Sequence, residues 1–229
     1  MQEKIFHHFF ASFAAFTFFG TMKITKIEQQ QKNKQRYSVY LDGEFAFGIH
    51  QSILLKAGLH TGEELTPDNI ADFEKQDALF RAKDASFRLL KYRQRSEAEL
   101  RKRLLQKSFD EEIVEAIITE LTQKDYLNDE EFARLYSEDL LTRKHIGPLR
   151  MRAELSKKQV PEEIIERTIQ TMYQKYDEYD LARKAAEKKL RTLTRVDNET
   201  AHRRVTNYLV RRGFDWDIIA EVVDIDPTE

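Results

Sequence analysis

The sequence of 229 residues contains no cysteine, which excludes disulfide bonds and any metal site built from thiolates. Glycine and proline are scarce, at 7 and 4 residues, so there are few breaks for regular structure. Charged residues make up 34% of the chain and hydrophobic residues 41%. This composition is typical of a folded, helix-rich protein, and the lack of cysteine favours a cytoplasmic location.

Sequence motifs for catalysis are also missing. The chain has no G-x-x-x-x-G-K-[ST] phosphate loop, no H-E-x-x-H and no glycine-rich turn from strand to helix. The histidines follow no metal-ligand spacing, and the acids Asp110, Glu111 and Glu112 fall in a first helical turn, where the helix dipole favours them. We therefore predict no catalytic residues, no metal and no cofactor, and expect a binding protein rather than an enzyme.

Residues 1–21 differ from the rest of the chain. Their apolar stretch, Phe9 to Phe19, is short for a membrane-spanning helix, which needs roughly 20 apolar residues. A signal peptide would have a strongly basic start and a small-residue cleavage site, and this segment has neither. We interpret Met22 as the initiator and residues 1–21 as an upstream extension or disordered leader. A signal or membrane segment is the alternative.

Residues 22–66 predict a small β-hairpin region followed by a short helix. Apolar residues alternate at Tyr37, Val39 and Leu41 before Asp42-Gly43, a dipeptide that favours a tight hairpin turn. Two or three strands are expected here, packed against a helix because such a sheet is not stable alone. Ser52 is the expected cap of the short helix.

The rest of the chain repeats one segment three times, at spacings of 51 and 54 residues. Phe109, Val160 and Phe214 align, and apolar residues recur nine and five positions before them and four and five after them. Repeats of this kind stack on their neighbours and present a long binding surface. We therefore predict a mainly α fold of three tandem helix-turn-helix-like repeats in an elongated array, over residues 67–127, 128–177 and 178–229.

Each repeat predicts three helices. The start signals include Ser96 with Glu99 as a capping box, Asp110, Asp129, Pro161, and Asp197 or Asn198. The expected helices cover residues 68–94, 96–107, 110–125, 129–144, 147–158, 161–176, 178–193, 198–212 and 215–223.

Charge alternates with the helix count. The segments that contain the second helices are basic and those that contain the third are acidic. By sequence the net charges are +7 over 81–108, −5 over 109–127, +3 over 146–159, −3 over 160–178, +3 over 195–213 and −6 over 214–229. The pattern predicts either a basic stripe that binds a polyanion or charge pairing between neighbouring helices.

The candidate partner or nucleic-acid contacts are the basic residues Arg93, Arg95, Arg101, Lys102, Arg103, Arg150, Arg152, Arg203, Arg204, Arg211 and Arg212. The spacing of eight between Arg203-Arg204 and Arg211-Arg212 suits either a phosphate backbone or a solvated helix face. Tyr92, Tyr136, Tyr208 and Trp216 are expected to be packing residues.

The blocks SEAELRKRLLQKSFDEEIVEAIITELTQKDYLNDEEFARLY and IGPLRMRAELSKKQVPEEIIERTI resemble the RecX family of bacterial recombination regulators. The resemblance covers about residues 23–229, and its most specific stretch is KDYLNDEEFARLY. It implies binding in the groove of the RecA filament on single-stranded DNA, with inhibition of the recombinase, ATPase and co-protease activities of RecA in DNA repair and the SOS response. The partners it implies are the RecA filament and single-stranded DNA, with double-stranded DNA bound weakly.

The expected protein is a cytoplasmic monomer with no membrane partner. The second hypothesis is a stand-alone DNA-binding regulator, in which one helix of each unit enters the major groove. Such a protein needs a few Arg, Asn or Gln at base-reading positions and a symmetric dimer. The repeats have Arg and Lys with no recurring Asn or Gln beside them, and nothing indicates a dimer interface. A third possibility is a structural adaptor whose charges pair internally.

Overall fold

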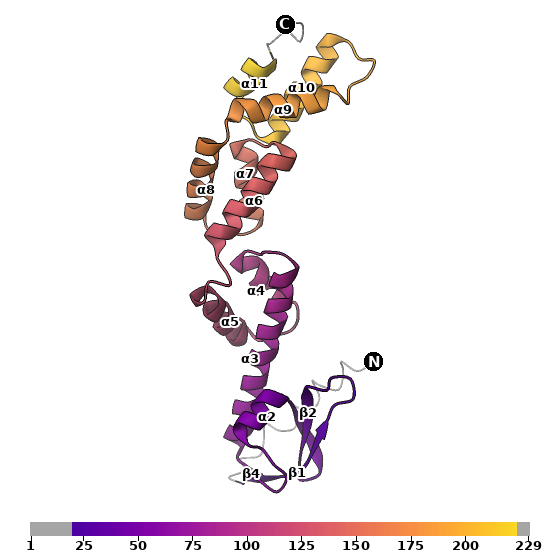
Figure 1. Cartoon of the computed structure of the whole chain (residues 1–229), viewed down its shortest axis with the longest axis vertical. Coiled ribbons are helices and arrows are strands. Elements are labelled where there is room, and N and C mark those ends of the chain that lie inside the picture. Colours follow the sequence, from indigo (N-terminus) through magenta and orange to yellow (C-terminus); the bar gives the residue numbers. More distant parts are fainter. Residues whose placement is uncertain (1–19, 224–229) are drawn as a thin grey trace. The chain divides into compact units, whose positions relative to one another are not determined.

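The computed structural model describes residues 20–223, so the interpretation of residues 1–21 falls almost wholly outside it. Contacts divide the chain into two compact units, with the division between Arg81 and Ala82, inside the long helix α3 (Pro67–Tyr92). Figure 1 shows strands only in the N-terminal unit and helices throughout the C-terminal unit. The predicted class, mainly helical with three-helix repeats and a small strand region, is confirmed.

The N-terminal unit contains a four-stranded antiparallel sheet in the order β3-β2-β1-β4. The strands are β1 (Met22–Gln29), β2 (Arg36–Leu41), β3 (Glu44–His50) and β4 (Glu64–Leu65). The predicted hairpin joins β2 to β3, and both Asp42 and Gly43 have positive φ, at 49° and 94°. One strand more is present than expected, because β4 has only two residues and so shows no alternation in the sequence.

Helix α2 (Gln51–Ala57) follows β3 directly and ends at Gly58, whose φ of 69° is left-handed. The expected cap, Ser52, is wrong by two residues. The His50 ring accepts the hydrogen bond from the backbone N–H of Ser52 and so caps the helix.

A buried carboxylate fixes α3 to the sheet. Asp77 is 3% exposed and accepts two hydrogen bonds from the Arg36 guanidinium, at 3.0 and 2.8 Å. The backbone N–H of His50 donates a third at 3.0 Å, and Arg81 pairs with the same carboxylate from the next turn of α3. Because buried charges need this degree of pairing, Asp77 ties the strand ends to the helix.

The repeats of the C-terminal unit have the helices predicted from the sequence, with ends that differ by up to three residues. After α3 they are α4 (Glu97–Leu105), α5 (Glu111–Gln123), α6 (Asp129–Lys144), α7 (Pro148–Lys157), α8 (Glu162–Lys175), α9 (Glu178–Leu190), α10 (Asn198–Arg212) and α11 (Trp216–Val223). The second helices of the three repeats are therefore α4, α7 and α10.

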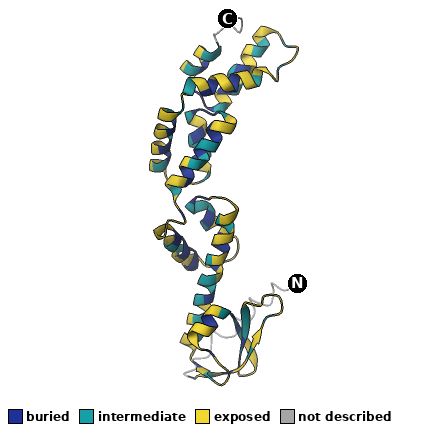
Figure 2. Ribbon diagram, in the orientation of Figure 1, coloured by how far each residue is buried: buried dark blue, intermediate teal, exposed yellow. Residues whose placement is uncertain are grey.

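The aligned apolar positions form the core. Leu104, Leu155 and Leu209, five residues before the alignment point, are all fully buried, and Figure 2 shows such buried stripes on the helices. The cores of the second and third repeats are continuous, so neighbouring repeats complete one another's cores as expected. The residue before each alignment point is left-handed: Ser108, Gln159 and Gly213 have φ of 62°, 55° and 79°.

Candidate partner-binding surface

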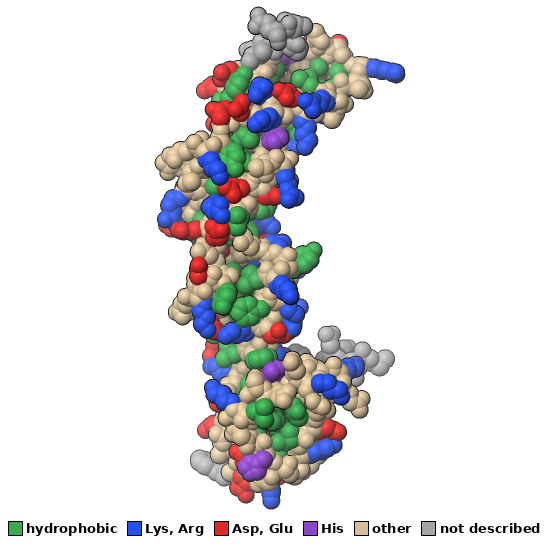
Figure 3. Space-filling view, viewed as in Figure 1, with side chains coloured by type: hydrophobic (Ala, Val, Ile, Leu, Met, Phe, Trp, Pro, Cys, Tyr) green, Lys and Arg blue, Asp and Glu red, His purple; other side chains and the backbone are tan. Residues whose placement is uncertain are grey.

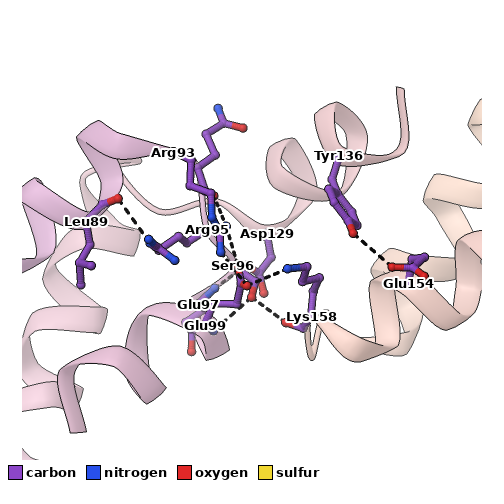
Figure 4. Close-up of polar contacts among 11 residues, drawn as sticks. Leu89, Arg93, Arg95, Ser96, Glu97, Glu99, Asp129, Tyr136, Glu154 and Lys158 are labelled. Atoms are coloured by element: carbon purple, nitrogen blue, oxygen red, sulfur yellow. Dashed lines mark hydrogen bonds and ion pairs between the residues drawn. The ribbon is translucent and has the colours of Figure 1, made fainter. Parts of the chain in front are cut away.

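The first and second repeats meet at the N-terminus of α4. The hydroxyl of Ser96 is buried, accepts the backbone N–H of Glu99 at 3.2 Å and donates to the carbonyl of Lys158 at 2.6 Å. Ser96 therefore caps α4, as predicted, and also binds the C-terminal end of α7 (Figure 4). A helix N-terminus has unpaired N–H groups, so this contact satisfies donors and acceptors of both helices.

Asp129, which the sequence predicts as the cap of α6, contributes to the same junction instead. The cap of α6 is Asn128, which accepts the backbone N–H of Glu131. The Asp129 carboxylate instead accepts the backbone N–H of Glu97 at 2.8 Å, at the start of α4 (Figure 4). Burial raises the pKa of Asp129, and the hydrogen bond from Glu97 opposes that rise.

An ion cluster of Arg93, Glu99 and Lys158 lies beside this contact, and we call it the Glu99 cluster. Arg93 donates to both carboxylate oxygens of Glu99, at 2.8 and 2.9 Å, and the Lys158 ammonium lies 2.9 Å from one of them. Burial raises the pKa of Glu99, but the hydrogen bonds from the two cations outweigh it and lower the pKa to about 2. Glu99 is therefore ionised throughout the neutral range and links the two repeats.

The second and third repeats meet at the corresponding positions. The backbone N–H of Gly147, which aligns with Ser96, donates to the carbonyl of Arg212, which aligns with Lys158, at 2.8 Å. The N–H of Leu149 donates to the carbonyl of Gly213 at 3.2 Å. The backbones are so close that a Cβ on Gly147 would lie 2.3 Å from the Gly213 oxygen. The C-terminal end of α7 thus meets the N-terminal end of α4, and the C-terminal end of α10 meets the N-terminal end of α7.

Two of the predicted basic residues are neutralised within their own repeats. Arg101 donates to both carboxylate oxygens of Glu115, at 2.6 and 2.8 Å. Arg152 pairs with Glu166, which aligns with Glu115, and also with Glu162. The alternative of charge pairing between the second and third helices therefore accounts for these two arginines.

Several other candidates are engaged locally. Arg93 belongs to the Glu99 cluster, and Arg150 pairs with Glu154 one turn along α7. Arg95 is 8% exposed and donates to the carbonyl of Leu89, and its burial lowers its pKa. Arg212 donates to the carbonyl of Lys144 and to the Tyr208 hydroxyl, so it faces the second repeat instead of sharing the exposed face of Arg211.

The remaining candidates are exposed, and within residues 20–223 they form no ion pair with a carboxylate. They are Lys102, Arg103, Arg203, Arg204 and Arg211. Acidic side chains lie among the basic ones on the face of the molecule that Figure 3 draws. Among the predicted contacts, the charge available to a partner therefore lies on parts of α4 and α10, and is not spread evenly along the second helices.

The four aromatic residues expected to pack divide into two that are half-buried and two that are exposed. Tyr136 and Tyr208 are half-buried against the core, as predicted, and Tyr136 stacks on Phe132 at 5.6 Å. The packing role expected for Tyr92 and Trp216 is wrong, since these side chains are 84% and 67% exposed. Tyr92 is the last residue of α3 and Trp216 the first of α11, and apolar register alone does not distinguish a core position from one at a helix end.

A cavity of about 330 Å³ lies beside the Glu99 cluster, between the first two repeats. Phe132, Leu135 and Tyr136 form its apolar lining, and Arg93 and Lys158 lie at its rim. Lys158 also lies 5.4 Å from the centre of the Tyr136 ring. Sequence reasoning missed this junction, although alignment of Lys107, Lys158 and Arg212 shows a basic residue recurring at the end of each second helix.

Within residues 20–223 no cluster of three or more His, Asp or Glu side chains is placed to hold a metal ion. In the same part of the chain, no helix has both the length and the apolar character needed to cross a membrane.

Comparison with known families assigns almost every described element. Residues 22–66 match the Regulatory protein RecX N-terminal domain. The first, second and third three-helix domains of RecX match residues 82–121, 128–169 and 176–223.

Whole proteins are similar over most of the chain. Regulatory protein RecX of Leuconostoc citreum is 33% identical over 203 residues, which cover 88% of this chain and 75% of that protein. The protein of the same name from Clostridium acetobutylicum is 29% identical over 87% of this chain and 94% of its own length. A crystal structure of regulatory protein RecX, 28% identical, superposes with a TM-score of 0.67 over 89% of this chain and 99% of that one. With its N-terminal region and all three three-helix repeats matched, this chain belongs to the RecX family of regulatory proteins.

Proposed function

We propose that this protein binds the filament that RecA forms on single-stranded DNA and inhibits the recombinase, ATPase and co-protease activities of RecA. Membership of the RecX family supports RecA as the partner. The observation that carries the proposal is the set of exposed basic residues without carboxylate partners on α4 and α10. A DNA-bound filament is a polyanion, and several weak contacts from one chain add through effective concentration.

The two repeat junctions support a filament as the target. They join α4, α7 and α10 end to end, so the exposed cations of α4 and α10 belong to helices that are connected through α7. A monomer can then make several contacts without a second copy. Binding to a DNA-bound recombinase would place this action in the cytoplasm, in DNA repair and the SOS response.

The test is the ATPase activity of RecA on single-stranded DNA, with the full chain added well below the concentration of RecA. We expect the activity to decline at these substoichiometric ratios. Stimulation would reverse the proposed sign of the effect. No effect, together with tight DNA binding without RecA, would favour the stand-alone DNA-binding regulator instead.

Charge-reversal variants test whether the exposed basic residues of α4 contribute to the inhibition. Lys102→Glu with Arg103→Glu should weaken the inhibition while leaving the helical content unchanged, because neither side chain pairs with a carboxylate within residues 20–223. Lys32→Glu with Lys34→Glu, in the loop between β1 and β2, makes the same change of charge as a control. Equal effects of the two double variants would contradict a specific role of α4.

A further inference from the structure

The third repeat lacks the ion pair that neutralises the second helix in the first two repeats. Thr206 is found where the others have a paired arginine, and Ala220 where they have the paired glutamate. Trp216 takes the position of Glu162, the second partner of Arg152. Both positions whose acids pair with Arg152 in the second repeat are therefore uncharged in the third, although Asp215, Asp217 and Glu221 remain acidic.

The basic residues of the third repeat lie before α11, and six acids follow them over residues 214–229. Residues 184–212, from the second half of α9 to the end of α10, contain nine Lys or Arg against three acids, a net charge of +6. Over the described part of the chain, no ion pair with a carboxylate is formed by Lys184, Lys188, Lys189, Arg191, Arg195, Arg203, Arg204, Arg211 or Arg212. In Figure 3 a basic side chain projects from the surface near the loop between α9 and α10.

The outward face of α10 presents these charges in a row. Arg203, Asn207 and Arg211 are each four residues apart and all exposed, so they lie one above another on the helix. At 1.5 Å per residue, Arg203 and Arg211 are about 12 Å apart along the helix axis. Arg204 is exposed on the same side. Arg203 lies in the field of the Asp197 carboxylate at the start of the helix and contributes to lowering the pKa of that group. No carboxylate of residues 20–223 forms an ion pair with Arg203, Arg204 or Arg211, so these guanidinium groups are available to phosphate oxygens.

An exposed aromatic side chain follows α10 in the sequence. Trp216 begins α11 and is 67% exposed. Trp216 aligns with Glu162, which pairs with Arg152 on α7, so we expect it to face the side of α10 that carries Thr206. Thr206 is one turn from both Arg203 and Val210. Val210 is 42% exposed. Arginines that follow a backbone, next to an exposed aromatic ring on which a base can stack, are typical of sites for single-stranded nucleic acid.

We propose that the third repeat is the part of the protein that holds single-stranded DNA, with Arg203, Arg204 and Arg211 on the phosphates and Trp216 stacked on a base. This inference deepens the proposed function and rests on it for the source of the DNA, which is the strand within the RecA filament. The first two repeats, whose arginines are largely paired, then contribute less to DNA binding.

Trp216 is the only tryptophan of the chain, so its fluorescence reports on this site alone. Titration of the full chain with an oligothymidylate in the absence of RecA should quench this fluorescence to a plateau. Trp216→Ala should weaken binding of a labelled oligothymidylate, measured by anisotropy, by roughly 5- to 150-fold. Unchanged fluorescence at saturating oligonucleotide, or no binding at low salt, would overturn the proposal.

The salt dependence of binding tests the arginines. Arg203→Gln with Arg211→Gln should reduce the slope of log K against log salt concentration by about 1.4, because each phosphate contact to a single strand contributes about 0.7. The control, Lys102→Gln with Lys107→Gln, removes the same charge from the first repeat and should change the slope less. Equal changes in the two double variants would overturn the assignment to the third repeat.

Two further comparisons distinguish DNA from acidic protein as the ligand, and this inference from the proposed function. If polyglutamate quenches Trp216 at the same concentration and salt as the oligonucleotide, the surface recognises acidic protein and the assignment to DNA fails. The binding assays contain no RecA, so they test this inference separately. A protein that binds oligothymidylate through the third repeat but leaves the RecA ATPase unchanged would contradict the proposed function alone.

Discussion

Replacing Glu99 with glutamine tests how the first two repeats are held together. The substitution keeps the size of the side chain and removes the charge that Arg93 and Lys158 share. In the folded protein the pKa of Glu99 is about 2, against an ordinary value of 4.5. A shift of this size corresponds to about 3 kcal/mol. Partial exposure of the cluster and solvent screening reduce the expected loss on Glu99→Gln to about 1–2 kcal/mol at neutral pH.

The pH dependence of this loss has a definite sign. A lowered folded-state pKa stabilises the protein above the unfolded pKa, and the stabilisation disappears as the pH falls toward the folded pKa. The difference in free energy of unfolding between the parent and Glu99→Gln should therefore be constant above pH 6. It should fall to roughly two fifths of that value near pH 3, as the carboxyl group is protonated in the unfolded chain.

Urea unfolding followed by circular dichroism, repeated from pH 7 to pH 3, measures this difference. Glu163→Gln, at an exposed position in the first turn of α8, is the matched control and should change stability by no more than about 0.5 kcal/mol. A loss that stays the same from pH 7 to pH 3 would refute the electrostatic account of the cluster. A loss no larger than that of the control would show that the cluster does not stabilise the junction.

Two further substitutions test other contacts. Asp77→Asn leaves Arg36 without its buried partner and should destabilise the N-terminal unit by about 3–5 kcal/mol. The loss should appear as faster hydrogen exchange of residues 22–66. Asp72→Asn, on the exposed side of α3, is the control, and equal exchange in both variants would contradict the role of Asp77. Gly147→Ala places a Cβ 2.3 Å from the Gly213 oxygen and should lower the free energy of unfolding in urea by about 1–3 kcal/mol. The control, Ser156→Ala on the exposed face of α7, should lower it little. A stable Gly147→Ala protein would mean that the second junction opens readily.

The sequence by itself determined the local structure and the repeat pattern. Leu104, Leu155 and Leu209 recur at one place in each repeat, and the apolar positions around them show the 3.6-residue period of helices that bury one face. Asp42-Gly43 specified a hairpin because both residues tolerate positive φ. These features depend on neighbours in the chain, so their physical cause can be read from a single sequence.

The tertiary structure decided which charges are available. Arg101 and Lys102 are adjacent and identical in charge, but helix packing brings Glu115 to Arg101 and no carboxylate of residues 20–223 to Lys102. Lys158 and Glu99 are 59 residues apart, and their pairing depends on how the two repeats meet. Net charge over a segment counts side chains without their partners, whereas the field that a ligand meets depends on distances set by packing.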